Sequence, residues 1–328
     1  MKIPQSKEQW DGWILGNTAH HQFPQSWEWG EILRSEGRAI ERYIFEKDGV
    51  INALAQVIVV LLPFGGVYGF VPKGPVLAQN YTGGILDNFR NFFIERKVVF
   101  TRVEPSYPLL PISNFTPVPT IDINPRATVI LDLTKDEAHL QNEMHQKTRY
   151  NIHLAQKKNL IVKTEKNLAV FLKLMKQTAK RDGFRLHTDK HYRAIFDSEM
   201  SRQITIYHEN APVASGVFIQ FGDTFTYLYG ASDHEYRALM APYLVQWEGI
   251  KMGKSLGCKY YDFFGIAPGQ RNRGGEYIYD PHHQYAGVTR FKFGFGGEVS
   301  TAPGTIDLVV DMPKYCLYKI LRWVRRLL

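Results

Sequence analysis

The chain has 328 residues, which is too long for one ordinary hydrophobic core and predicts two domains, and its 44% of hydrophobic residues is enough to fill both. Its two cysteines, Cys258 and Cys316, lie far apart, and its eleven histidines show no metal-ligand spacing, so the sequence encodes neither a disulfide framework nor a metal site. Forty Lys and Arg against 32 Asp and Glu give a net charge of +8, which favours a polyanionic partner such as RNA or an anionic membrane face.

The N-terminus is polar, and no apolar run approaches the roughly 18 residues of a membrane-spanning helix. We therefore expect a cytoplasmic protein. After a helix at residues 27–36, apolar alternation predicts two strands that form a hairpin, at 41–46 and 51–62, and a third strand at 67–71. The next element is a helix, predicted by the spacing of Ile85, Phe89, Phe92 and Phe93. A strand at 98–103 completes the order strand, strand, strand, helix, strand.

The second half repeats this order. Asn167 and Asp189 precede two amphipathic helices, and strands are expected at 204–209, 212–221 and 224–230. A helix with a small-residue face follows, and then a strand at 259–264. The joint is expected near Thr134, which forms an S/T-x-x-E capping box with Glu137. The duplicated order is typical of two acetyltransferase-type (GNAT-like) α+β domains.

Residues 314–328 form a basic amphipathic helix. Its apolar stripe is made of Leu317, Ile320, Leu321, Val324 and Leu328. We expect the helix to dock on the first domain. The alternative is a contact with the membrane surface, favoured by the basic residues Arg322, Arg325 and Arg326.

In residues 290–295, three phenylalanines alternate with Arg290, Lys292 and Gly294. A strand here would bury one face of rings and present Lys292 on the other. A lysine held rigidly in this way suits acyl transfer, because attack of an amine on an ester builds an oxyanion that an ammonium stabilises.

Three segments carry a resemblance to a known family: residues 287–299 (GVTRFKFGFGGEV), residues 144–160 and residues 227–266. They resemble the FemABX family of non-ribosomal peptidyltransferases, which move an aminoacyl group from transfer RNA to an amine of a peptidoglycan precursor. The resemblance implies two GNAT-like domains, the first made of residues 1–133 plus 302–328 and the second of residues 134–301. It also implies aminoacyl-tRNA as co-substrate, a lipid-linked or UDP-linked muropeptide as partner, and no cofactor. The helical coiled-coil arm that several members insert is expected to be missing, since only a short span follows Asn151.

The resemblance also implies site residues. The family's functionally important lysine matches Lys292, beside Phe291 and Arg290. Glu104, which precedes Pro105, matches an acidic residue that could orient or deprotonate the attacking amine, and Asp262 is the competing acid. The nearest counterparts of the residues that bind the precursor are Tyr192, Arg185, Tyr227 and Tyr229, of which the last two are expected on one face of a strand.

A basic stripe is predicted on a helix by Arg149, His153 and Lys157, at i, i+4 and i+8. We expect it to meet phosphates of transfer RNA, with a solvated helix face as the alternative.

Two other functions fit parts of the sequence. An acetyl-CoA-dependent N-acetyltransferase of the same fold needs a glycine-bearing loop that seats the pyrophosphate, but residues 237–242 read RALMAP, with Met240 and Pro242 in place of small residues. A non-catalytic RNA- or membrane-binding protein would explain the charge but would leave Lys292 without a role.

Overall fold

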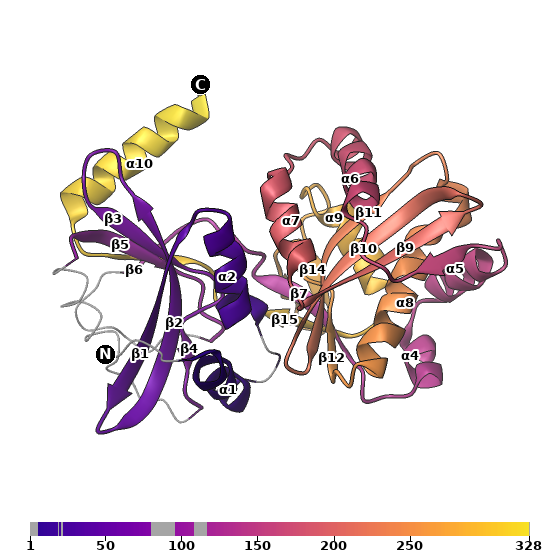
Figure 1. The fold of residues 1–328 in the computed structure, drawn as a ribbon, viewed down its shortest axis with the longest axis horizontal. Coiled ribbons are helices and arrows are strands. Elements are labelled where there is room, and N and C mark those ends of the chain that lie inside the picture. Colours follow the sequence, from indigo (N-terminus) through magenta and orange to yellow (C-terminus); the bar gives the residue numbers. More distant parts are fainter. Residues whose placement is uncertain (1–5, 19, 21, 80–95, 108–116, 328) are drawn as a thin grey trace. The chain divides into compact units, whose positions relative to one another are not determined.

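The computed structural model describes residues 6–18, 20, 22–79, 96–107 and 117–327, with side chains up to residue 324. The chain is α+β and forms two compact units (Figure 1). Unit 1 comprises Met1–Arg126 and Ala302–Leu328, and unit 2 comprises Ala127–Thr301. The division comes seven residues before the expected boundary at 133/134, because strand β7 (Ala127–Asp132) belongs to the sheet of unit 2.

Unit 1 is built on a mixed sheet with the order β1-β2-β3-β5-β16-β6. Among the strands that the structure describes in this unit, β3 and β5 pair in parallel, the other neighbours are antiparallel, and β4 adds to β2. The described helices of unit 1 are α1 (Lys7–Asn17), α2 (Trp27–Ser35) and α10 (Met312–Leu327). Its strands are β1 (Ala39–Lys47), β2 (Val50–Leu61), β3 (Val67–Val71), β4 (Val76–Leu77), β5 (Val98–Val103), β6 (Pro117–Pro119) and β16 (Ile306–Val309).

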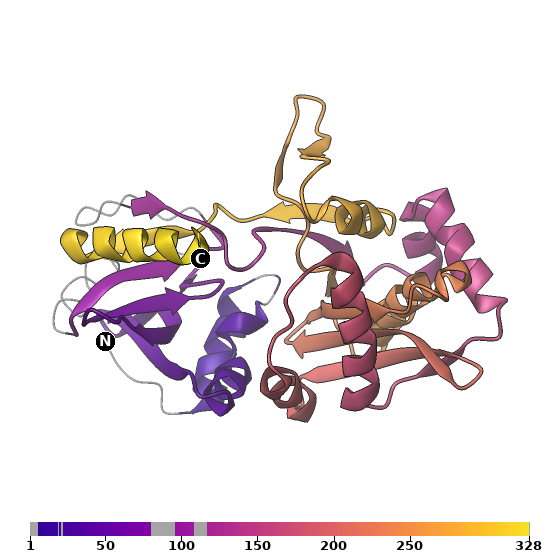
Figure 2. The same ribbon diagram turned by 90° about the horizontal axis from the view of Figure 1, so that it is seen from above.

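Unit 2 contains a second mixed sheet, with the order β15-β7-β12-β11-β10-β9-β8. Its strands are β7, β8 (Ile161–Lys163), β9 (Ser201–His208), β10 (Ala211–Phe221), β11 (Thr224–Ser232), β12 (Tyr260–Asp262) and β15 (Glu298–Thr301), with a separate hairpin of β13 (Gly269–Arg271) and β14 (Tyr277–Tyr279). Its helices are α4 (Glu137–Glu143), α5 (Gln146–Gln156), α6 (Leu168–Asp182), α7 (Asp189–Asp197), α8 (Ala241–Ser255) and α9 (Ala286–Phe293). In Figure 2 the hairpin of β13 and β14 projects from the rest of unit 2.

The two sheets share one plan. In each, three antiparallel strands are followed by a parallel strand, β5 or β12, and that strand pairs antiparallel with a strand from elsewhere in the chain, β16 or β7. The duplicated order expected from the sequence is confirmed for the described strands. The helix expected around Ile85 to Phe93 lies outside the described residues.

Helices cover both faces of the sheet in unit 2. Helix α8 packs closely on β10, because Gly249 lets Phe218 approach the helix backbone: a Cβ atom at position 249 would lie 2.7 Å from the Phe218 ring. Helices α6 and α7 cover the opposite face (Figure 1). There Phe171 of α6 and Tyr192 of α7 pack on Tyr229.

Helix starts follow the predicted capping chemistry in part. The side chain of Asn167 accepts a hydrogen bond from Val170 N, as expected. The capping box of Thr134 is wrong, since Asp136 accepts the hydrogen bond from His139 N and Thr134 instead bonds to Asp132. Between Ala127 and Thr301, which are described throughout, no helix exceeds the 15 residues of α6 and α8, so the inserted helical arm is absent there.

Candidate functional site

The sheet of unit 2 opens between two parallel strands. Strands β11 and β12 pair over only three residues, from Thr224–Tyr260 to Thr226–Asp262, although β11 continues to Ser232. Beyond Asp262 the chain leaves β11 through Phe264 and Gly265, whose φ angles of 47° and 53° turn the backbone sharply. This opening exposes backbone carbonyl groups that need partners.

Lys292 supplies these partners from helix α9. The expectation of a strand at residues 290–295 is wrong. The segment is helical as far as Phe293, and the ring of Phe295, two residues beyond the end of the helix, lies 5.3 Å from that of Phe291. The buried residues of α9 are Ala286, Thr289 and Lys292, which recur every three residues.

The Lys292 side chain crosses from α9 to the turn after β12. Its Nζ donates to Gly265 O at 2.6 Å and also to Phe264 O. One helical turn earlier, Thr289 Oγ1 accepts from Ala267 N at 2.8 Å. Helix α9 therefore holds the 264–267 turn through two side chains of one face.

Lys292 is buried, with 6% of its surface exposed. Burial lowers its pKa from 10.5 to about 7, and the nearby negative charge of Asp262 opposes that shift. The Nζ atom also lies 5.9 Å from the centre of the Tyr227 ring. A lysine with such a pKa exchanges a proton near neutral pH, and two hydrogen bonds fix its position.

Asp262 is buried beside this lysine at the end of β12. Its Oδ1 accepts hydrogen bonds from Phe264 N at 2.7 Å and from Thr128 Oγ1. These contacts orient the carboxylate and shape the same turn that Lys292 holds. A role for Asp262 in deprotonating an amine stays a prediction.

The expectation that Tyr227 and Tyr229 face the same side is wrong. Val217 pairs with Tyr229 and Phe218 pairs with Tyr227, so Leu228 is an extra residue that forms a β-bulge. Tyr227 packs on Phe218, on the α8 face of the sheet. The bulge turns Tyr229 to the opposite face.

Tyr229 belongs to an aromatic cluster beneath α6 and α7. Its hydroxyl lies 2.9 Å from His191 Nε2, and its ring packs edge-on against Tyr192 at 5.5 Å. Burial raises the pKa of Tyr192. Arg185 lies exposed on the loop between α6 and α7. His191 was missed in the sequence, where a lone histidine on a helix carries no signal.

Phe291 and Arg290 flank Lys292 on α9. Phe291 is half-buried, and its ring packs edge-on against Tyr243 of α8 at 5.0 Å. Arg290 is exposed. Phe291 therefore packs α9 against α8, whereas the Arg290 side chain is accessible to solvent.

Two members of the basic stripe, Arg149 and His153, lie on helix α5 as expected, and Lys157 is the residue that caps its C-terminus, but the three differ in exposure. His153 and Lys157 are exposed. Arg149 is half-buried, and its Nη1 donates to the carbonyl oxygens of Met144 and Gln141 at the end of α4. A cation at that position satisfies the last carbonyl groups of a helix, so Arg149 also has a structural task.

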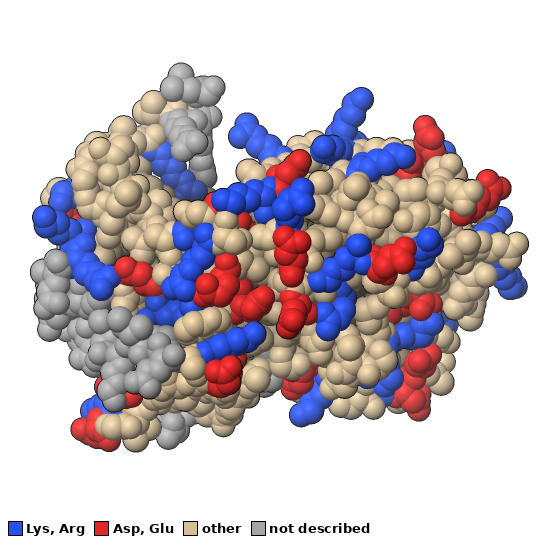
Figure 3. All heavy atoms as spheres, viewed as in Figure 1, with Lys and Arg blue, Asp and Glu red and all other residues tan. Residues whose placement is uncertain are grey.

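A second group of exposed cations, not singled out from the sequence, lies on α6, on α7 and on their connection (Figure 3). Its members are Lys173, Lys176, Lys180, Arg181, Arg185, Lys190 and Arg193. Three nearby acids, Asp182, Asp189 and Asp197, reduce its net charge. We call this group of cations the rim of α6 and α7, and it is an alternative to the basic stripe as a surface that binds phosphates.

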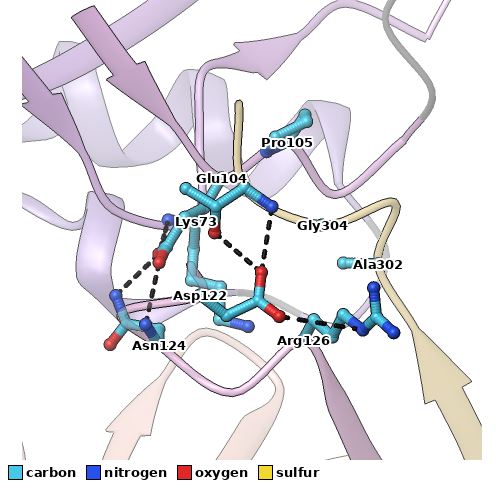
Figure 4. A pocket seen from close by; sticks show the side chains of 9 residues that line it. Lys73, Glu104, Pro105, Asp122, Asn124, Arg126, Ala302 and Gly304 are labelled. Carbon is cyan, nitrogen blue, oxygen red and sulfur yellow. Dashed lines mark hydrogen bonds and ion pairs between the residues drawn. The ribbon is translucent and has the colours of Figure 1, made fainter. Parts of the chain in front are cut away.

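Glu104 lines a small pocket in unit 1 (Figure 4). Its Oε1 accepts from Ile123 N at 3.0 Å and Asn124 N at 2.8 Å, and its Oε2 accepts from Asn124 Nδ2 at 2.7 Å and Lys73 N at 3.3 Å. Four donors thus engage the carboxylate, which favours an anchoring task over proton transfer. Its catalytic role stays a prediction.

The described residues contain no group of three or more His, Cys, Asp or Glu side chains arranged to hold a metal ion. Among the same residues, no helix combines the length and the apolar character that crossing a membrane requires.

The fold and these residues define a class: tandem GNAT-like α+β proteins with a buried lysine where two parallel strands separate. A sequence model of the FemAB family matches residues 115–198 and 197–322, together more than half of the chain. The chain belongs to the FemAB family.

Named relatives are distant. The lipid II:glycine glycyltransferase of Staphylococcus epidermidis is 22% identical over 262 residues, covering 60% of this chain and 61% of that protein. The aminoacyltransferase FemA of Staphylococcus aureus is 26% identical over 147 residues, covering 44% of this chain and 32% of FemA. The chain thus spans about three fifths of the length of the glycyltransferase.

The crystal structure of FemX has the same fold. Its TM-score with this chain is 0.78 at 18% sequence identity, and the match covers 97% of this chain and 99% of FemX. The expected pair of GNAT-like domains is confirmed.

Proposed function

We propose that this protein is an aminoacyltransferase, which moves an amino acid from aminoacyl-tRNA to an amine of a peptidoglycan stem peptide and so builds an interpeptide bridge. The observation that carries the proposal is the family match across residues 115–322, since that region contains the buried Lys292. The names of the glycyltransferase and of FemA support the acyl transfer and the precursor as acceptor.

Lys292 has the chemistry that this reaction needs. Attack of the amine on the aminoacyl ester forms a tetrahedral intermediate with a negative oxygen, and the bond to the ribose oxygen then breaks to leave an amide and the free transfer RNA. An ammonium group fixed by Gly265 O and Phe264 O stabilises that oxygen through its remaining N–H. A covalent lysine intermediate has no part in this proposal.

The acceptor side of the proposal is assigned to other residues of unit 2. Tyr227 borders the Lys292 side chain, and Asp262 orients the turn below it. Tyr192, Tyr229 and Arg185 are assigned to the precursor, with the exposed Arg185 meeting its negative charges. Lys157, His153 and Arg149 are assigned to the transfer RNA, and the protein would work at the cytoplasmic face of the membrane.

The test is incubation of the purified protein with mixed charged transfer RNAs and with either a lipid-linked or a UDP-linked precursor, read by mass spectrometry. We expect one precursor to gain the mass of an amino acid residue. Acetyl-CoA offered as the only donor should leave both precursors unchanged. Gain of an acetyl group would favour the N-acetyltransferase alternative. Binding of transfer RNA without any change in mass would favour the non-catalytic one.

A further inference from the structure

Helix α10 docks on unit 1 through one aromatic face. The Tyr315 ring meets the Phe100 ring of β5 edge-on at 5.1 Å, and its hydroxyl donates to Asp307 Oδ2 at 2.8 Å. The ring of Tyr318 lies 4.8 Å from that of Phe100. Asp307 is itself held by Arg102 in a buried ion pair at 2.8 Å. Helix α10 therefore lies along the sheet of unit 1 (Figure 2), held there by contacts with the buried residues Phe100 and Asp307.

The side of α10 turned away from this docking face is apolar and exposed. Leu317, Ile320, Leu321 and Val324 follow the i, i+3, i+4, i+7 pattern of a single stripe. Ile320 is 57% exposed, and Trp323 beside the stripe is 63% exposed. A helix that had only to dock would bury its apolar stripe and expose polar residues, whereas α10 exposes apolar residues on the far side as well.

The charge of this helix is of one sign. Residues 312–328 contain five basic residues and no acidic one: Lys314, Lys319, Arg322, Arg325 and Arg326. An exposed apolar stripe on a strongly basic helix, with a tryptophan at its edge, is the composition of helices that lie in the headgroup region of an anionic bilayer.

A second copy of this chain fits the stripe less well. Pairing two α10 helices would bring together two segments that each carry five positive charges and no negative one, and like charges repel at short distance. An anionic bilayer offers the complementary charge, and its acyl region accepts the apolar side chains.

We propose that α10 is an interfacial helix, which binds the surface of an anionic membrane through Leu317, Ile320, Leu321, Trp323 and Val324 while Tyr315 and Tyr318 hold it to unit 1. This surface is independent of the chemistry proposed for unit 2. It would keep the protein where a lipid-linked acceptor lies.

The test is sedimentation of the full-length protein with vesicles of phosphatidylcholine alone and of phosphatidylcholine mixed with phosphatidylglycerol. We expect binding to the phosphatidylglycerol vesicles and its weakening at high salt. Replacing both Ile320→Ser and Val324→Ser should weaken that binding by about tenfold or more. Lys319→Gln should weaken it by about fivefold, the effect of one basic residue at the surface.

The matched control carries Val50→Ser and Leu61→Ser, which are 59% and 81% exposed on β2 and lie outside the stripe. This control should bind vesicles as the wild type does. All the variants should keep the unfolding midpoint of the wild type, because the altered side chains are exposed.

A second measurement compares the tryptophan emission of the wild type and of Trp323→Phe. The part of the emission due to Trp323 should shift to shorter wavelength when phosphatidylglycerol vesicles are added. The proposal would be overturned if the Ile320→Ser, Val324→Ser double variant (the stripe variant) bound vesicles as tightly as the control variant. It would also be overturned if the wild type did not bind vesicles. A dimer seen by light scattering in the wild type, and lost in the stripe variant, would assign the face to a second copy instead.

Discussion

The Nζ atom of Lys292 lies 2.6 Å from the carbonyl oxygen of Gly265, a residue 27 positions earlier in the chain. This contact joins α9 to the turn that follows β12, at the place where β11 and β12 separate. The Lys292 side chain thus has two tasks: it holds the turn at the opening of the sheet, and it places a positive charge there.

The first prediction separates these two tasks. Lys292→Met keeps the apolar stem and removes the charge, so the rate of transfer should fall by about a hundredfold or more while the protein stays folded. Lys292→Arg should recover only part of the rate, because a planar guanidinium places its charge differently.

The matched control is Lys254→Met. Lys254 Nζ also donates to two backbone carbonyl oxygens, those of Leu133 at 2.7 Å and of Lys135, but it lies on α8 away from the turn. This variant should lose stability and keep its rate of transfer. A folded Lys292→Met variant with the wild-type rate of transfer would show that Lys292 has only a structural role.

The second prediction concerns stability against pH. The pKa of Lys292 falls from 10.5 to about 7 on folding, so between these values the unfolded chain binds more protons than the folded one. The contribution of Lys292 to the free energy of unfolding therefore rises with pH across this window, by at most about 1.4 kcal/mol per pH unit. Denaturant unfolding of the wild type and of Lys292→Met at several pH values measures the difference. A difference that does not change between pH 7 and 10 would contradict the lowered pKa.

The third prediction is that acetyl-CoA does not bind. At the start of α8, the amides of Leu239, Met240 and Tyr243 already donate to protein carbonyl groups, and Pro242 has no N–H, so the turn offers few donors to a pyrophosphate. A true cofactor at a hundredfold excess over its Kd would stabilise the protein by about 2.7 kcal/mol. Thermal-shift titration measures this, with adenosine as control. A saturable shift with acetyl-CoA alone would contradict the prediction.

The fourth prediction concerns transfer RNA. Lys157→Ala should weaken binding and reduce the steepness of its salt dependence by about one counterion, since one phosphate contact is lost. Arg149→Ala should in addition lower the unfolding midpoint, because Arg149 donates to carbonyl groups at the end of α4. Lys176→Ala on α6 is the comparison. A salt dependence that changes with Lys176 and not with Lys157 would move the RNA surface to the rim of α6 and α7.

Regular strands and helices were predictable from local patterns, and the site was predictable only in part. Strands such as Val67–Val71 and Val98–Val103 have the expected bounds, because runs of β-branched and aromatic residues fit few other structures. The pattern around Lys292 predicts a strand, but six alternating residues fit both a strand and a helix. The partners that decide between them, Phe264 and Gly265, are distant in sequence.

The bulge at Leu228 was not predictable either. An added residue in one strand can be recognised only from its pairing with the neighbouring strand. It moves each side chain that follows it to the opposite face of the sheet. It separates Tyr227 from Tyr229 and so divides the expected substrate residues between two faces of the sheet.

The central claim is that an amino acid moves from an ester on transfer RNA to an amide on the precursor. The most direct measurement uses transfer RNA charged with a radiolabelled amino acid, mixed with the precursor and the protein. We predict that label passes to the precursor in a form stable to mild base, at a rate that Lys292→Met lowers and Lys254→Met does not. Label that stays on the transfer RNA with every charged amino acid and both forms of precursor would contradict the account.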